Sequence, residues 1–370
     1  MPKPPIKQKS DSATRADALE RAKRLEEYAV ANPQQLTLFQ LLDLKPQEQQ
    51  RYSHTLELYD FMPKYHWGKV ERIGGKFLNA LEREFECRGT QYKIRITPAR
   101  ITDKDGVDRE YFPSKREELV EDALRRFATT RQGVFLDDMA GVTFTLYQLQ
   151  QELKRNGHSY STAQIKDALY ICAKTNIEVR SGDGRAVLIS SMFETLGLQT
   201  REDWEGKGAK TKAFVRFNSL VTQSIKSGTY RQLNYEKSMS YTNVVARQLH
   251  KRMSHHYTQA SIIHPYTIGL LTIIRDFGLA EYARPSLNLS HVLKALEEMK
   301  EKEVVLSYVI EKIVDAGNRD KLLDAKITIT PDPHFTVDTM HANTRQRSIR
   351  QQLEVPPLTA SDKRKIEKNR

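Results

Sequence analysis

Residues 143–189 carry the densest run of structural signals in the sequence, and the run begins with a helix. Thr145 and Gln148 have the spacing of a capping box, in which each side chain accepts a hydrogen bond from the other residue's backbone N–H. The apolar stripe behind them consists of Leu146, Leu149 and Leu153. Asn156 and Gly157 then supply residues that tolerate the positive φ found at helix ends. The pattern predicts a helix that starts near residue 146 and stops at residue 156.

The same run continues with a second helix and a hairpin. Ser161 and Gln164 repeat the capping box. The stripe that follows consists of Ile165, Ala168, Leu169 and Cys172. The period then changes to two around a Ser-Gly-Asp-Gly turn at residues 181–184, with Ile177 and Val179 before the turn and Val187 and Ile189 after it. Two helices and a hairpin in this order predict a winged helix, in which the second helix suits a DNA groove and the hairpin suits phosphates.

Composition limits the partner and the compartment. The 370 residues suffice for two or three domains, and 59 Lys and Arg residues against 47 acidic residues give a net charge of +12. This excess favours a polyanionic partner. The two cysteines, Cys87 and Cys172, are too few for a disulfide framework or a cysteine metal site and indicate a reducing compartment. No apolar run approaches the ~20 residues that span a bilayer, and the N-terminus lacks the apolar core of a secretory signal. We therefore expect a cytoplasmic protein with no membrane partner.

The chain as a whole predicts an α+β fold with two tandem winged-helix domains between flexible arms. Residues 1–55 form the N-terminal arm, and residues 56–220 form the first winged-helix domain. Residues 221–335 form the second winged-helix domain with its connecting helix. Residues 336–370 are rich in Lys and Arg, lack apolar periodicity and predict a disordered basic tail.

Several patterns fill in the first domain. Residues 56–61 alternate apolar and polar side chains, which predicts a strand, and Asp105-Gly106 predicts a hairpin turn. Residues 117–126 predict an amphipathic helix that leads into the winged helix. Residues 213–218 predict a strand that we expect to pair with the wing.

The second domain repeats the first in outline. Residues 240–257 predict a connecting helix with a solvated basic face that includes His255 and His256. A helix is expected to open at Thr267, and residues 289–299 carry the stripe of the next helix. Strands over residues 304–314 and 325–330 flank the turn at residues 317–319 and complete a second wing.

Candidate DNA-binding residues lie on both predicted reading helices and wings. The first domain offers Lys166 and Lys174 on its helix and Arg180 and Arg185 on its wing. The second domain offers Arg284, Ser286, Asn288, Ser290, His291 and Lys294 at its helix, and Arg319 and Lys321 on its wing. Each charge alone fits an ordinary exposed side chain, but their joint placement favours DNA. Small polar residues at the start of the second helix make that domain the expected base reader, while the first domain is expected to share in dimerisation.

The sequence lacks complete catalytic motifs. A phosphate-binding loop fails at residues 70–77, where Val70 replaces the first glycine and Phe77 follows the lysine, and at residues 206–211, where Ala209 precedes the lysine. His255 and His256 are adjacent, so they cannot form the spaced histidine pair of a nickase metal site. No His, Glu or Asp cluster has zinc spacing. We therefore expect no catalytic residue, no metal and no cofactor, and a protein that is not an enzyme.

Three stretches resemble plasmid replication initiators with paired winged helices, most closely the TrfA type. They are residues 143–149, 214–218 and 246–253, within a looser likeness from about residue 56 to residue 335. The resemblance implies binding of direct repeats, called iterons, in the double-stranded DNA of a plasmid origin. It also implies opening of adjacent AT-rich DNA and recruitment of host helicase or initiator proteins.

The N-terminal arm contains a second motif, Gln-Leu-Thr-Leu-Phe at residues 35–39. On spacing alone, Leu36, Leu38 and Phe39 fit packing into the core better than docking in a partner's pocket. The motif resembles, however, the Gln-Leu-x-Leu-Phe sequence by which bacterial replication proteins bind the β sliding clamp. The resemblance favours docking, with Gln35 hydrogen-bonded at the pocket rim and Leu38 and Phe39 inside the pocket.

Two other classes of protein fit parts of the sequence. A winged-helix transcriptional regulator accounts for the two domains but has no need for the motif at residues 35–39. A helicase-loading adaptor that binds only protein leaves the basic wings unexplained. The initiator accounts for both features.

Overall fold

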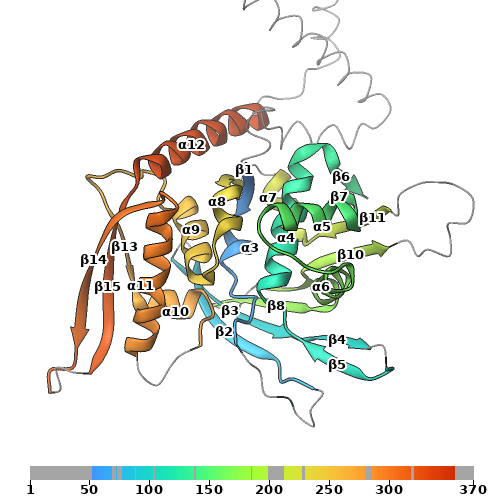
Figure 1. The fold of residues 1–370 in the computed structure, drawn as a ribbon, viewed down its shortest axis with the longest axis horizontal. Helices are drawn as coiled ribbons and strands as arrows, with labels where there is room; N and C mark the ends of the chain where they lie inside the picture. The colour runs from blue at the N-terminus through green and yellow to red at the C-terminus, as the bar shows by residue number, and fades with distance from the viewer. Residues whose placement is uncertain are drawn as a thin grey trace, which may run out of the picture.

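The computed structural model describes residues 52–68, 72, 77–87, 89–102, 105–136, 139–184, 186–198, 212–226, 230–280, 285–317 and 321–354. In this part of the chain the elements form two winged-helix units, each built around three helices and a hairpin, as the sequence predicts (Figure 1). The clamp-like motif at residues 35–39 lies outside the described residues.

The first unit is organised by three helices. They are α4 (Lys115–Phe127), α5 (Leu146–Arg155) and α6 (Thr162–Lys174). Both predicted capping boxes form, because Thr145 accepts from the N–H of Gln148 and Ser161 accepts from the N–H of Gln164. The predicted stripes of α5 and α6 are buried in the core, apart from the partly buried Leu146. The helix–turn–helix of this unit is therefore confirmed.

The wing of the first unit is part of a larger sheet. Four antiparallel strands run in the order β2 (Leu81–Cys87), β3 (Thr90–Thr97), β8 (Asn176–Ser181) and β9 (Val187–Ser191). The wing hairpin β8–β9 is held at its turn, where the N–H of Gly182 donates to the carbonyl of Gln91 at 2.7 Å. This wing is consequently braced along its length by β3.

A second four-stranded sheet flanks the helices. Its order is β10 (Phe193–Leu198), β11 (Lys212–Phe217), β7 (Met139–Thr145) and β6 (Gly133–Leu136). The expected pairing of residues 213–218 with the wing is wrong, because β11 pairs with β10 and β7. Ala213, Val215 and Phe217 are all buried, so the strand occupies a central position that the wing edge does not offer.

Smaller elements complete the first unit. They are β1 (Tyr52–Leu56), α3 (Glu57–Phe61), β4 (Ala99–Thr102), β5 (Asp108–Tyr111), the π-helical turn η1 (Ala128–Gln132), α7 (Ser219–Lys226), β12 (Tyr230–Asn234) and α8 (Tyr235–Ser240). The predicted turn at Gly106 joins β4 to β5 with φ +74°. The strand predicted over residues 56–61 is wrong, because consecutive Tyr59, Asp60 and Phe61 are all buried in helix α3, which overrides their alternation.

The second unit repeats the order of the first. Its elements are α9 (Val244–His256), β13 (Tyr266–Gly269), α10 (Leu270–Asp276), α11 (Pro285–Glu301), β14 (Val305–Val314) and β15 (Leu322–Pro331). The helix expected to open at Thr267 begins instead at Leu270, because Thr267 and Ile268 pair with the wing strand β15. The sheet order is β13-β15-β14, so this wing is supported on one side only.

Two hydrophobic cores correspond to the two units. The first extends through Met239 along the chain, and the second runs from Tyr241 to Phe335. Residues 221–239, which the sequence grouped with the second domain, bury Val221, Tyr235 and Met239 in the first core. The change of core therefore falls at residue 240, just before α9.

Helix α12 (Pro333–Glu354) occupies much of the region predicted to be a disordered tail, and that prediction is wrong for residues 336–354. Its buried apolar residues Phe335, Ala342 and Ile349 recur only once every seven positions, which is too sparse for a clear stripe. Polar contacts add to the packing, because the Arg231 guanidinium on β12 donates to Gln346 and Asn343 at 2.7 Å each. Phe335 lies in the second core and Ile349 in the first, so α12 lies across both units (Figure 1). Residues 355–370 lie outside the described part of the chain.

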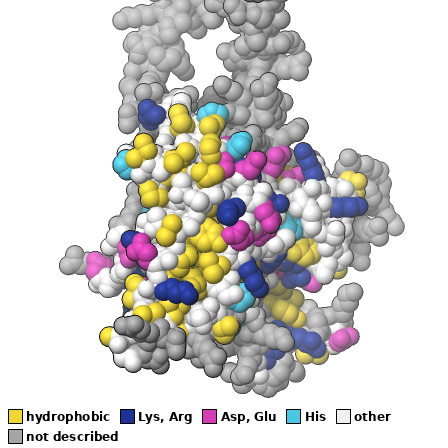
Figure 2. Space-filling model, turned by 60° about the vertical axis from the view of Figure 1, so that its left-hand side comes forward, with side chains coloured by type: hydrophobic (Ala, Val, Ile, Leu, Met, Phe, Trp, Pro, Cys, Tyr) yellow, Lys and Arg dark blue, Asp and Glu magenta, His cyan; other side chains and the backbone are white. Residues whose placement is uncertain are grey.

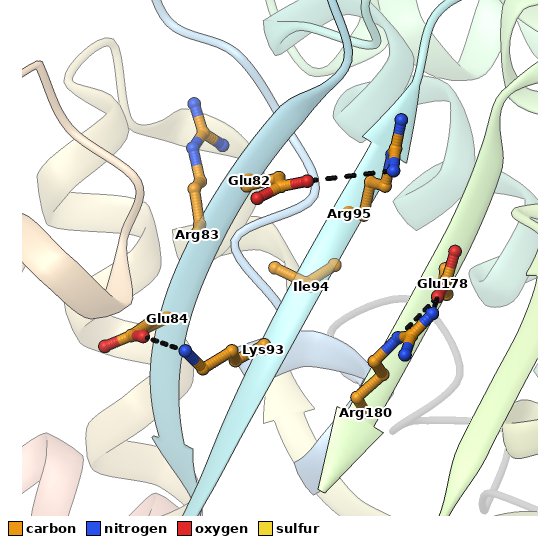
Figure 3. Close-up of a pocket in the computed structure, with 8 residues that line it drawn as sticks. All are labelled: Glu82, Arg83, Glu84, Lys93, Ile94, Arg95, Glu178 and Arg180. Atoms are coloured by element: carbon orange, nitrogen blue, oxygen red, sulfur yellow. Dashed lines mark hydrogen bonds and ion pairs between the residues drawn. The ribbon is translucent and has the colours of Figure 1, made fainter. Parts of the chain in front are cut away.

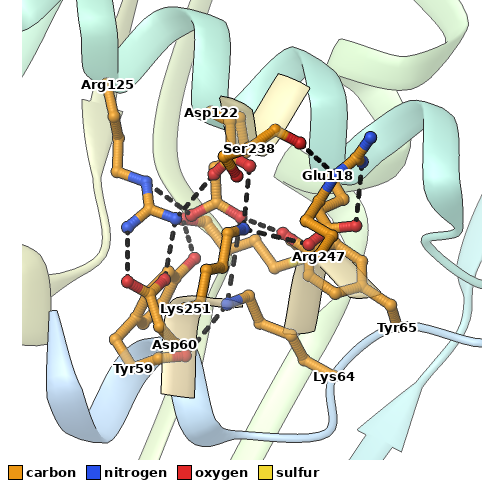
Figure 4. Close-up of polar contacts among 12 residues, drawn as sticks. Tyr59, Asp60, Lys64, Tyr65, Glu118, Asp122, Arg125, Ser238, Arg247 and Lys251 are labelled. Atoms are coloured by element: carbon orange, nitrogen blue, oxygen red, sulfur yellow. Dashed lines mark hydrogen bonds and ion pairs between the residues drawn. The ribbon is translucent and has the colours of Figure 1, made fainter. Parts of the chain in front are cut away.

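A buried charge cluster joins α4 of the first unit to α9 of the second (Figure 4). The Glu118 carboxylate accepts from Lys251 Nζ at 2.9 Å and from Arg247 Nη1 at 3.2 Å, and Asp122 lies 2.8 Å from Lys251 Nζ. Arg125 donates to Asp60 at 2.7 and 3.0 Å. We call these six residues the α4–α9 charge cluster. Each acid and base has an opposite charge beside it, as burial requires.

The cluster corrects the prediction that α9 has a solvated basic face. Arg247 is fully buried and Lys251 is 3% exposed. His255 is also buried, with its ring 5.4 Å from that of Phe61, and only the neighbouring His256 is exposed. Arg247 and Lys251 therefore serve the contact between the units, because α4 presents carboxylates to them.

Candidate nucleic-acid interface

Helix α11 is the second helix of the second helix–turn–helix, and one face fixes it in place. The buried side chains on that face are Leu289, Val292, Ala295, Leu296 and Met299. Glu298 adds a polar anchor, because its carboxylate accepts from the N–H groups of Thr242 and Asn243 at 2.6 and 2.9 Å, at the start of α9. The helix is therefore positioned by both apolar packing and a cap on its neighbour.

Asn288, which the sequence predicts to contact DNA, has a structural role instead. Asn288 is 2% exposed, and its Nδ2 donates to the carbonyl of Ala280 at 2.9 Å. The contact ties the first turn of α11 to the segment that follows α10. The prediction that Asn288 faces DNA is therefore wrong, because its position at helical spacing from Val292 and Ala295 directs it to the core.

The exposed face of α11 differs in charge between its two ends. Ser286, Ser290, His291 and Lys294 are exposed within the first ten residues of the helix, as predicted, and these ten residues include no acidic residue. Glu297 and Glu301 are exposed in the C-terminal half. Since phosphates repel carboxylates and are attracted to helix N-termini, the N-terminal half is the end suited to a duplex.

The wing β14–β15 lies beside the same end of α11. A strand of 10 residues is longer than a helix of 17, roughly 33 Å against 26 Å. Since β14 starts just after α11 ends, the free end of the wing extends beyond the N-terminus of α11, as Figure 1 shows on the left of the molecule. The hydroxyl of Tyr308 on β14 donates to Glu297 at 2.5 Å, and this bond raises the pKa of Tyr308 to about 12. Wing and helix thus form one surface.

The second wing is less basic than the sequence suggests. Lys321 lies 3.5 Å from Asp315 and Lys326 lies 3.3 Å from Glu311, so both ammonium groups have a carboxylate beside them. The exposed aliphatic side chains of this hairpin are Leu306, Val309, Ile313, Val314 and Leu323. Figure 2 brings this side of the molecule forward and shows hydrophobic side chains gathered in a broad band among scattered charges.

The first unit contributes a more neutral surface. Lys166 is exposed on α6, whereas Lys174 donates to the carbonyl of Arg100 at 3.3 Å on the neighbouring β4. Arg180 on the wing is paired with Glu178 on the same strand. Both line a shallow hollow of about 350 Å³ on the sheet β2-β3-β8, where Lys93 also pairs with Glu84 at 2.9 Å (Figure 3). Three of the four basic side chains that line this hollow lie beside carboxylates, and the fourth, Arg83, donates to the carbonyls of Pro63 and Tyr65, so the hollow is a weak candidate for binding phosphates.

The remaining candidate residues lie outside the described part of the chain. They are Arg185, Arg284 and Arg319 among the DNA-binding candidates and Gln35, Leu36, Leu38 and Phe39 in the clamp-like motif.

Sequence reasoning missed the α4–α9 charge cluster, although a signal for it exists. Glu118 and Asp122 are four residues apart on one predicted helix, and Arg247 and Lys251 are four residues apart on another. Two helix faces of opposite charge and equal spacing match each other across an interface. The anchoring role of Glu298 has no comparable signal, because its partners are backbone groups.

Within the described ranges, no three His, Cys, Asp or Glu side chains gather closely enough to hold a metal ion. Both cysteines are buried and unbridged. None of the helices placed by the structure combines the length and the apolar character needed to cross a membrane.

Fold and interface together define a tandem winged-helix protein in which the second helix of each helix–turn–helix has one exposed face. No protein-family model and no curated protein matches the sequence. Among solved structures, the chain is similar to domains 2 and 3 of RctB, with 12% sequence identity and a TM-score of 0.45 over 71% of this chain and 94% of that one. It is also similar to the Pi initiator protein crystallised in complex with iteron DNA, with 12% identity and a TM-score of 0.40 over 59% of this chain and 91% of that one.

Proposed function

We propose that this protein is a plasmid replication initiator that binds repeated sequences in the duplex DNA of an origin. The distribution of charge along α11 supports the proposal, because its first ten residues expose Ser290, His291 and Lys294 and include no carboxylate. Hydroxyl, imidazole and ammonium groups at a helix N-terminus can contact base edges and phosphates in a major groove. In this proposal the chain has no catalytic role and needs no metal or cofactor.

Selection of bound duplexes from a random library at physiological salt tests the proposal directly. We expect one repeat to be enriched and to bind about 10³-fold or more tightly than scrambled DNA, with affinity that falls steeply as salt rises. Enrichment of no sequence would contradict an initiator and favour an adaptor that binds protein.

Lys294→Ala is expected to weaken binding of the selected repeat by about 5- to 100-fold, the range for loss of one specific contact. The affinity would be measured by fluorescence anisotropy over a series of salt concentrations. Lys300→Ala is the matched control, because Lys300 is an exposed lysine of the same helix that lies beside Glu297 in the acidic half. Equal losses in the two variants would show that the N-terminal half of α11 is not the reading end.

We further propose that residues 35–39 bind the β sliding clamp and that the initiator helps to open the origin and recruits host helicase or initiator proteins. Support for clamp binding comes from the resemblance of the motif, in which Leu38 and Phe39 are the apolar anchors.

Phe39→Ala is expected to reduce clamp affinity by about 30-fold or more, the loss that follows removal of a central apolar anchor. Binding to the selected repeat should not change, because the motif precedes both units. Surface plasmon resonance with immobilised clamp would measure the first affinity and anisotropy the second. Unchanged clamp binding would remove the motif from the proposal and leave the DNA-binding part intact.

A further inference from the structure

Leu287 is an apolar side chain on the end of α11 that is suited to a duplex. It is the third residue of the helix and is 51% exposed. Among the described residues it packs in neither hydrophobic core, whereas its neighbour Leu289 is buried in the second. Packing among the described residues therefore does not account for a leucine at this position.

The neighbours of Leu287 are the polar groups of the proposed reading surface. Ser290, His291 and Lys294 follow at three, four and seven residues, which places all of them on the same side of the helix. The buried row of α11 lies on the opposite side, and the acidic residues lie at its other end. Leu287 thus lies at the leading end of a surface whose other members can donate hydrogen bonds.

A leucine side chain can recognise only one feature of the major groove. It neither donates nor accepts hydrogen bonds, so it cannot distinguish the donor and acceptor patterns of the bases. Thymine alone presents a methyl group there, and aliphatic side chains make favourable contact with that group. Resting on the proposed function, we propose that Leu287 contacts the methyl group of a thymine and makes the repeat specific for thymine at one position.

Leu287 differs from other exposed leucines in the polar residues that surround it on α11. Leu271 on α10 is 45% exposed, so it is a leucine of similar exposure on a helix of the same unit. It lies outside α11 and has none of the polar reading residues one turn away. Leu271→Ala is therefore the matched control for Leu287→Ala.

Replacement of each thymine of the selected repeat by deoxyuridine tests the contact, because deoxyuridine lacks only the methyl group. For the unmodified protein, one replacement is expected to weaken binding about fourfold, the effect of one buried methyl-sized group. Leu287→Ala should bind the thymine and deoxyuridine forms of that site equally, and Leu271→Ala should still discriminate between them. Leu287→Met, which keeps an aliphatic chain, should retain part of the discrimination.

The outcomes separate this inference from the proposed function. If the unmodified protein selects no repeat, the proposed function itself fails. If a repeat is selected but Leu287→Ala still discriminates thymine from deoxyuridine, or no thymine of the repeat is sensitive, the inference is overturned while the function stands. Unaltered DNA binding by Leu287→Ala would likewise overturn the inference.

Discussion

Glu118→Gln is expected to lower the free energy of unfolding by about 3–5 kcal/mol, the usual cost of removing one partner from a buried ionic group. The Glu118 carboxylate accepts hydrogen bonds from Arg247, Gln248 and Lys251 at 3.2, 2.7 and 2.9 Å. Glutamine has nearly the same shape but no charge, and its amide nitrogen would face donors. Arg247 would remain fully buried without its counter-charge. Urea unfolding followed by circular dichroism would measure the change.

A matched substitution at the surface controls for the loss of one carboxylate. Glu84 is exposed and pairs with Lys93 on the neighbouring strand at 2.9 Å. Because solvent screens such a pair, Glu84→Gln should move the urea midpoint little. Similar midpoints for the two variants would mean that the α4–α9 charge cluster contributes nothing to the contact between the units.

We also expect acidification to lower the free energy of unfolding substantially. Burial lowers the pKa of His250 to about 3, and burial also lowers the pKa of His255 to about 3. In the unfolded chain both imidazoles return to a pKa near 6.5. Between about pH 6.5 and pH 3 the unfolded chain therefore binds protons that the folded chain does not, so stability falls as the pH falls.

The expected size of this effect is about 1.4 kcal/mol per pH unit for each histidine, or about 2 kcal/mol each at pH 5. Asp60 adds to the loss only at lower pH, because burial alone would raise the pKa of its carboxyl but Arg125 holds that pKa below its usual range. Urea midpoints between pH 7.5 and pH 4.5 would measure the slope. His250→Gln should flatten the slope, and the exposed His264→Gln should leave it unchanged. A flat slope in the unmodified protein would refute the prediction.

Local signals predicted the parts of this fold that depend on neighbouring residues. The capping boxes at Thr145 and Ser161 and the turns at residues 105–106 and 181–184 formed where the sequence placed them. Each depends on hydrogen bonds or backbone angles within a few residues, so the sequence contains the needed information.

Features set by distant partners were not predictable in the same way. The alternation of residues 56–61 predicted a strand, but residues 57–61 form helix α3. Asp60 of this helix accepts a hydrogen bond from Arg125, which lies 65 positions away in the chain. Helix α12 is held partly by Arg231, more than 100 residues earlier in the chain. Patterns of hydrophobicity do not reveal such polar contacts, and a basic helix such as α9 shows no sign of burial until its acidic partner is placed.

The candidate interface shows the same difference between local and distant signals. Ser286, Ser290, His291 and Lys294 are exposed on α11 because the period of its buried stripe fixes the opposite side. Asn288 was misplaced because a small polar residue on the edge of that stripe was read as exposed, although it binds a backbone carbonyl inside. The pairing of Arg180 and Lys321 with carboxylates depends on side-chain contacts that charge counting does not show.

The course of α12 gives the molecule an unusual connectivity. The chain passes from the first core to the second near residue 240, and α12 then returns from Phe335 in the second core to Ile349 in the first. The two units are therefore linked covalently at both ends of the second one, and the second unit is in effect an insertion between α8 and the C-terminal part of α12. The first unit cannot be excised as a continuous segment without the second, because its core is completed by Ile349, which follows the second core in the chain, whereas the second core lies within one continuous segment from Tyr241 to Phe335.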